Sequence, residues 1–209
     1  MLRARSEVAK TIRRAAILDA AALRFDEVGT DLTLDQVASA AGLTRSTLYG
    51  YAATREELLL LLTSRELDGF FDHLAGGIRR RRSANGVAVL VLDAVIARPR
   101  LAPLLASCSV VFERNISLDA AIVWKQHLHD HLLVTGAQID STLGLVDGSG
   151  ARFLLHVHAA VTGLHGVAFP PEVAAKAITD AGLDALRVDF AEELIVSLTA
   201  LAGVLLTTS

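Results

Sequence analysis

The sequence predicts an all-α protein, in which a small N-terminal helical domain is followed by a larger helical domain. Apolar residues recur at helical spacing along most of the 209 residues, and no stretch alternates apolar and polar residues as a half-buried strand does. Capping patterns mark several helix starts near the N-terminus. Apolar residues make up 52% of the chain and charged residues 21%, a composition that supports a buried core and argues against disorder.

The first helix is predicted over residues 10–28, after a basic arm at residues 1–9 that we expect to be mobile. Ile17, Ala21 and Phe25 lie on one face at helical spacing, and Gly29 ends the helix. This helix would be the scaffold of a three-helix domain.

Two short helices joined by a tight turn follow. Thr33 and Gln36 form a capping-box pattern that opens a helix near Leu34, and Gly42 can take the left-handed conformation that ends it. Thr44 is the N-cap of a second helix, which we expect to run from Arg45 to about Tyr51. Such a pair of helices is a helix-turn-helix.

A second capping box, Thr54 with Glu57, opens a long helix at Arg55.

In the helix-turn-helix, Leu48 is expected to face inward and the polar residues around it outward. Arginine, hydroxyl and tyrosine side chains suit DNA bases and phosphates, and Arg55 lies in a first helical turn that favours a phosphate. The predicted DNA-binding residues are Thr33, Thr44, Arg45, Ser46, Thr47, Tyr49, Tyr51 and Arg55.

This stretch resembles the DNA-binding domain of TetR-family transcriptional regulators. The likeness rests on Gly29 and on Leu34-x-x-Val37-Ala38-x-x-Ala41-Gly42-Leu43, Thr47-Leu48-Tyr49-x-Tyr51 and Arg55-Glu56-Glu57-Leu58. Three positions depart from the family pattern. Ala52 replaces a phenylalanine that anchors the recognition helix, Arg55 replaces a lysine, and Gly50 replaces a larger residue at the end of that helix.

The resemblance divides the chain into a helix-turn-helix domain at residues 1–53 and a helical effector-binding and dimerisation domain at residues 54–209. Looser similarity to one branch of the family continues through the second domain, for example at Thr162-Gly163 and Pro170-Pro171. After the long helix, which the pair Gly76-Gly77 ends, helical patterns cover residues 87–97, 101–115, 118–136, 151–168 and 188–206, with Ser117 and Asp189 as caps.

Charge is distributed unevenly along the chain. Residues 1–55 carry eight lysines and arginines against six acidic residues, whereas residues 56–209 carry twelve against seventeen. Basic charge is therefore concentrated near the predicted recognition helix, and the acidic remainder would not bind DNA. We interpret the run at residues 79–82 as a solvated cluster at a helix end rather than as a second DNA-binding patch.

The compartment is predicted from what the sequence lacks. Cys108 is the only cysteine, so an intrachain disulfide is excluded, which fits a reducing cytoplasm. We expect no membrane span: the apolar stretch at residues 153–171 contains three histidines and ends in prolines, and the run at 194–206 is too short to cross a bilayer.

The helices at 151–168 and 188–206 are nearly free of charge, and small residues such as Ala159, Ala160, Gly163 and Gly166 permit close approach. They are the predicted homodimer surface, and the resemblance implies a four-helix bundle across the dimer axis. It also implies a small-molecule effector bound inside the C-terminal helices. The candidate effector-binding residues are Cys108, Phe112, Trp124, His127, His156 and Val161.

The histidine-rich segment at residues 127–131 is the only part of the sequence that suggests a metal. On a helix, His127 and His131 would lie one turn apart, whereas His129 and Asp130 would point elsewhere, which leaves too few ligands. The sequence therefore favours solvated or pocket-lining histidines and predicts no metal site.

We therefore predict a sequence-specific transcriptional regulator that binds a palindromic operator as a homodimer, a repressor released by an unidentified effector. An alternative is a DNA-binding dimer without effector response, and a second is a metal-binding enzyme that uses the histidines at 127–131. The sequence shows no phosphate-binding glycine loop, no nucleophile–base pattern and no paired carboxylates, so we expect neither catalysis nor a cofactor.

Overall fold

The structure, a computed structural model, describes residues 2–206, except for the side chains of residues 2–6 and 109. Within this range the chain forms ten α-helices and no strand, which confirms the predicted all-α class. The chain divides into two compact units. The first comprises Met1–Arg65 and Ser107–Trp124, and the second comprises Glu66–Ala106 and Lys125–Ser209.

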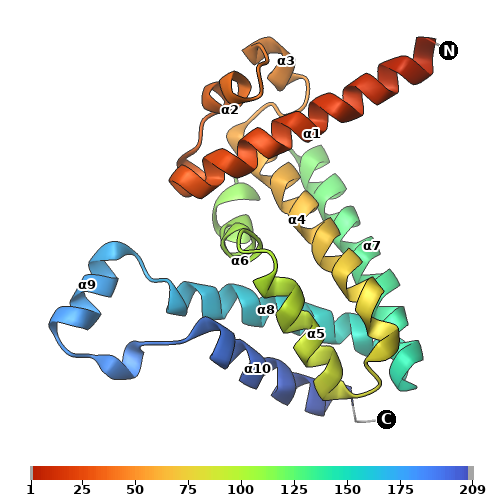
Figure 1. Cartoon of the computed structure of the whole chain (residues 1–209), viewed down its shortest axis with the longest axis vertical. Coiled ribbons are helices and arrows are strands. Elements are labelled where there is room, and N and C mark those ends of the chain that lie inside the picture. Colours follow the sequence, from red (N-terminus) through yellow and green to blue (C-terminus); the bar gives the residue numbers. More distant parts are fainter. Residues whose placement is uncertain (1, 207–209) are drawn as a thin grey trace. The chain divides into compact units, whose positions relative to one another are not determined.

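The first unit contains the helix-turn-helix. Helix α1 (Leu2–Val28) packs against α2 (Leu34–Ala40), and α2 packs against α3 (Arg45–Tyr49), as Figure 1 shows. Its core is built from aliphatic and aromatic side chains that these helices turn inward: Ile17, Ala21, Phe25, Leu32, Val37, Ala38, Leu48 and Leu58. Gly42 ends the turn after α2 with a φ of +66°, the left-handed conformation that was predicted.

Two boundaries in this unit differ from the sequence prediction. Helix α1 begins at Leu2, so the predicted mobile arm at residues 1–9 was wrong from residue 2 onward. The side chains of Arg3 and Arg5, which contribute to the basic charge of this segment, lie outside the described part of the structure. Helix α3 ends at Tyr49 because Gly50 is its C-cap, so Gly50 lies at the helix end, where its low helix propensity costs little.

Helix α4 (Arg55–Gly77) starts where the second capping box was predicted. The Thr54 hydroxyl accepts the Glu57 N–H at 3.1 Å. The Glu57 carboxylate accepts the N–H of Ala53, at 2.8 Å, in place of that of Thr54. Both free backbone donors are satisfied, with the return bond displaced by one residue.

The remaining helices, apart from α9, follow the predicted segments with shifted ends. They are α5 (Ala84–Ile96), α6 (Leu101–Ser107), α7 (Leu118–Leu143), α8 (Ser149–Ala168), α9 (Glu172–Asp180) and α10 (Phe190–Leu205). A π-helical turn at Cys108–Phe112 extends α6, as the predicted segment 101–115 anticipated. In the second unit α10 packs against both α5 and α8 (Figure 1). The Ser117 hydroxyl accepts the Ala120 N–H at 3.2 Å, and the Asp189 carboxylate accepts the Glu192 N–H at 2.9 Å. Both predicted caps are therefore confirmed.

Helix α9 was not predicted, and α7 extends beyond its predicted end at Gly136. Helix α9 has apolar residues at helical spacing, but it buries no side chain, has no side-chain cap and follows two prolines, which read as a break in the chain. Gly136 does not end α7. A glycine stands there because α8 packs closely against this position. A Cβ on Gly136 would lie 2.5 Å from the backbone N and 2.8 Å from the Cα of Ala151.

At this α7–α8 junction the Asp140 carboxylate of α7 caps the start of α8. Its two oxygens accept the N–H groups of Gly148 at 2.8 Å and Gly150 at 2.6 Å, and the Asp140 side chain is buried. The bonds satisfy donors that a helix N-terminus leaves free and place negative charge at the positive end of the helix dipole.

Among residues 2–206, no single helix has the length and apolar character needed to cross a membrane. Only α8 and α9 taken together, a pair bent by 60°, meet the criteria of length and composition.

Candidate nucleic-acid interface and internal cavity

Two side chains hold helix α3 in place: Leu48 on its inner face and Thr44 at its start. Leu48 is fully buried, and the Thr44 hydroxyl accepts the Thr47 N–H at 3.2 Å. The opposite side carries Thr44, Arg45, Ser46, Thr47 and Tyr49, which are exposed except for the half-buried Thr47, and which we call the α3 face. The predicted inward and outward positions of this helix are therefore what the structure shows.

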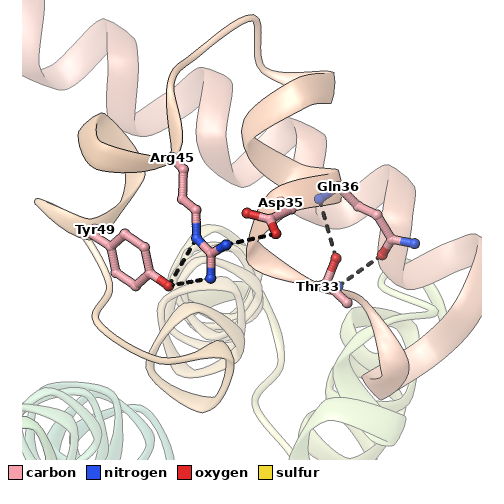
Figure 2. A network of polar contacts seen from close by, with 5 residues as sticks. All are labelled: Thr33, Asp35, Gln36, Arg45 and Tyr49. Carbon is pink, nitrogen blue, oxygen red and sulfur yellow. Dashed lines mark hydrogen bonds and ion pairs between the residues drawn. The ribbon is translucent and has the colours of Figure 1, made fainter.

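Arg45, the first residue of α3, is held in place by contacts with Tyr49 and Asp35 (Figure 2). Its guanidinium donates to the Tyr49 hydroxyl from Nε at 3.1 Å and from Nη2 at 2.9 Å, and from Nη1 to the Asp35 carboxylate on α2 at 3.0 Å. The guanidinium carbon also lies 5.4 Å from the centre of the Tyr49 ring. The side chain is 60% exposed, so the guanidinium remains accessible to a ligand.

The same contacts favour the charged form of Arg45. The hydrogen bond to Tyr49 and the charge of Asp35 raise the pKa of Arg45 above its usual value. A cation in a fixed position suits bidentate recognition of a guanine edge or a phosphate, because less side-chain freedom is lost when the bonds form. Asp35 was missed from the sequence, since only folding brings α2 and α3 together.

Thr33 serves first as a cap. Its hydroxyl accepts the Gln36 N–H at 3.3 Å, and its own N–H donates to the Gln36 side-chain oxygen at 2.9 Å, which confirms the capping box (Figure 2). The residue is exposed at the start of α2, so the predicted DNA contact remains sterically open.

Tyr51 differs from its predicted outward position. It is half-buried, and its hydroxyl donates to the Lys10 carbonyl of α1 at 3.4 Å. The contact places this turn of α1, where Lys10, Arg13 and Arg14 are exposed, beside the residues that follow α3. The basic charge expected near the recognition helix is therefore present in the first unit.

Arg55, predicted to bind a phosphate, is engaged by its neighbour. Its guanidinium donates to Glu56 Oε1 from Nε at 3.0 Å and from Nη2 at 2.7 Å. A phosphate could recruit Arg55 only in competition with this carboxylate.

Comparison with family models covers both parts of the chain. Residues 17–62 match the model of bacterial regulatory proteins of the tetR family, and residues 64–207 match the model of the tetracyclin repressor-like C-terminal domain. This chain belongs to the TetR family of transcriptional regulators. It is a DNA-binding regulator of the helix-turn-helix type, a family whose members typically act as dimers.

Solved structures share the fold of this TetR-family protein. One is a TetR-family transcriptional regulator from Streptomyces coelicolor, 20% identical, with a TM-score of 0.56 over 91% of this chain and 98% of the other. Another is the fatty acid degradation regulator FadR from Bacillus halodurans, 15% identical, with a TM-score of 0.58 over 92% and 95% of the two chains. No curated protein sequence matches the chain.

The second unit of the TetR-family chain contains a small, partly open cavity. Its volume is about 30 Å³, and its lining is apolar except for His158. The lining residues are Leu67, Phe70, Phe71, Val95, Leu101, Leu105, Leu128, Leu132, Leu154, Val157, His158 and Val161.

The predicted effector-binding residues do not gather around this cavity. Only Val161 lines it. His156 is exposed on the far side of α8, because it precedes the buried Val157 and turns away from it; His158 occupies the polar position in the lining instead.

The other predicted effector-binding residues lie elsewhere. Cys108, Phe112 and Trp124 are buried in the first unit, where Trp124 Nε1 donates to Glu113 at 2.9 Å. His127 lies in the second unit at a surface hollow outside the cavity lining.

Proposed function

We propose that this TetR-family regulator is a repressor that binds a palindromic operator as a homodimer and is released by a small apolar effector. The observation that carries the DNA-binding part is the α3 face, with Arg45 fixed and exposed between Asp35 and Tyr49. A side chain so placed can enter the major groove without first being ordered.

Within the α3 face we assign Arg45 to base recognition and the hydroxyl groups to bases or phosphates. Thr44 and Thr47 share a hydrogen bond of 2.8 Å, so their hydroxyls present one combined donor and acceptor. Asp35 opposes the approach of phosphates and releases its partner only when a better acceptor, such as a guanine edge, is supplied. That arrangement disfavours binding to random DNA.

The homodimer is proposed to form through α8 and α10. Both helices leave apolar side chains exposed, with Leu155 at 54%, Val167 at 53% and Val196 at 58%. A Cβ added to Gly163 or Gly166 on α8 would meet nothing within 4 Å, so this surface has room for a second copy. A symmetric pair also supplies the two recognition helices that half-sites one DNA turn apart require.

Gly163→Arg tests the dimer, because the monomer has space for the side chain and a close helix–helix contact would not. We expect the variant to sediment as a folded monomer at micromolar concentration, while the wild type sediments as a dimer. Gly76→Arg, at another open glycine, is the matched control and should remain dimeric. A wild-type protein with the mass of one chain would refute the proposal.

The effector is proposed to enter the apolar cavity of the second unit. At about 30 Å³ the cavity is far smaller than the roughly 300–1,000 Å³ of drug-sized sites, so a ligand must displace lining side chains. That requirement couples binding to a change of conformation. Release from DNA then needs the expanded state to bind the operator less tightly.

The first experiment is selection of bound sequences from random duplex DNA with the full chain, read by sequencing. A palindromic motif with half-sites about one helical turn apart supports the operator-binding dimer, and the absence of enrichment contradicts it. The selected operator then becomes the probe for release. Displacement by saturated fatty acids or other apolar compounds, weakened by Val161→Trp in the cavity, supports the effector site; retention of DNA across such a panel favours a regulator without effector response.

A further inference from the structure

The second unit brings a carboxylate from α4 against two histidines of α7. Asp68 Oδ1 lies 3.1 Å from Nε2 of His127 and 2.9 Å from Nε2 of His131. One ligand atom from each of the three side chains lies within 4.8 Å of the other two. From these contacts we propose that Asp68, His127 and His131 form a binding site for a divalent transition metal of the Zn²⁺ type.

The spacing fits metal coordination after a small adjustment. Zn²⁺ holds histidine nitrogens and carboxylate oxygens at about 2.0–2.2 Å, so neighbouring ligand atoms of a tetrahedral site lie roughly 3.3 Å apart. The two observed separations are slightly shorter. Asp68 is 50% exposed, so its carboxylate can rotate and thereby shift its oxygen by the few tenths of an ångström that an ion requires.

The two histidines are already oriented. The His131 ring stacks on the buried Phe71 ring with centroids 4.4 Å apart and planes inclined by 6°, and the His127 ring stands nearly perpendicular to His131 at 88°. Nε2 of His127 is shielded from solvent and has no hydrogen bond within the described part of the chain, since its 3.1 Å approach to Asp68 lacks hydrogen-bond geometry. An ion would satisfy that nitrogen.

The surroundings leave a coordination position open. His127 and His131 line a surface hollow of about 350 Å³ together with the carboxylates of Asp72 and Asp130. Water from the hollow would provide a fourth ligand. Two imidazoles favour a transition ion over Mg²⁺ or Ca²⁺, which prefer oxygen ligands throughout.

The sequence prediction of no metal site counted two histidines without a third ligand. Asp68 precedes His127 by 59 residues and His131 by 63, and only the packing of α4 against α7 supplies it. His129 points away as predicted, and its 3.4 Å contact is with its neighbour Asp130.

The test is a calorimetric titration of Zn²⁺ into the full-length, chelator-treated protein. We expect one ion per chain with a dissociation constant at or below the micromolar range, and no comparable binding of Mg²⁺. His127→Gln, His131→Gln and Asp68→Asn should each weaken Zn²⁺ binding by at least tenfold. His129→Gln, an exposed histidine in the same helix turn, is the matched control and should bind as the wild type does.

Two results would overturn the site: no saturable Zn²⁺ binding by the wild type, or affinities of the Asp68→Asn and His131→Gln variants equal to that of the control. Visible absorption of the Co²⁺-loaded wild type gives a second measurement that needs no variant to fold. Ligand-field bands without thiolate charge transfer support nitrogen and oxygen ligands, whereas a thiolate band would assign the ion to Cys108 and refute the proposal. These measurements involve no DNA, so their outcome is independent of the repressor proposal.

Discussion

Replacing Gly136 by alanine at the α7–α8 junction should destabilise the second unit. The added Cβ would lie 2.5 Å from the backbone N and 2.8 Å from the Cα of Ala151, so the helices must separate by about 1 Å to restore ordinary contact. Overpacking costs about 1–3 kcal/mol, and backbone atoms place this site towards the upper end since they cannot rotate aside. Lengthening the two Asp140 bonds adds about 1 kcal/mol, and the higher helix propensity of alanine offsets a similar amount.

The net loss is therefore about 2–3 kcal/mol, which for a chain of this size lowers the melting temperature by roughly 4–12 °C. Calorimetry or circular dichroism of the full chain measures it. Gly76→Ala is the control, because its Cβ meets nothing within 4 Å and its melting temperature should be unchanged or slightly raised. Equal melting temperatures for the two variants would show that the α7–α8 crossing is not as close as described.

Three further outcomes are expected. Leu48→Ala, at a fully buried position, should cost about 2–5 kcal/mol in chemical unfolding; a loss below 1 kcal/mol would contradict its role under α3. Arg45→Ala should lower operator affinity roughly ten- to a hundredfold; an equal loss of affinity for the operator and for random DNA would make Arg45 a phosphate contact. Asp35→Asn, which removes the negative charge beside Arg45, should raise affinity for random DNA. Burial lowers the pKa of His165 below 6.5, so the unfolded chain binds more protons and stability falls as the pH drops through about 6.5. His165→Gln should reduce that fall between pH 7.5 and 5.5, and an unchanged pH profile would exclude His165 as its source.

The helix starts could be predicted because their causes are local. Thr33, Thr44 and Asp189 each bond a backbone N–H three residues ahead, so the spacing alone identifies them. Helix α9 has no such signal: it buries nothing, and the prolines before it indicate a break as readily as a helix start.

The sites were predictable in part for the same reason. The exposed residues of α3 follow from the inward position of Leu48, a relation within one helix. Asp35 beside Arg45 and Asp68 beside His131 are contacts between helices, which periodicity does not reveal. The candidate effector-binding residues follow from the chemical character of the side chains alone. Only burial in the folded protein distinguishes the half-buried His158 from the exposed His156.

The burial of Cys108 makes this protein convenient for spectroscopy. A thiol that is 3% exposed and close to Thr63 reacts slowly with maleimides and methanethiosulfonates under native conditions. A cysteine introduced at the exposed Ser46 would then take a spin label or fluorophore selectively, with no need to remove the native thiol. In a homodimer such labels form a symmetric pair, and the distance between them, followed by pulsed electron resonance, would report the separation of the two recognition helices directly.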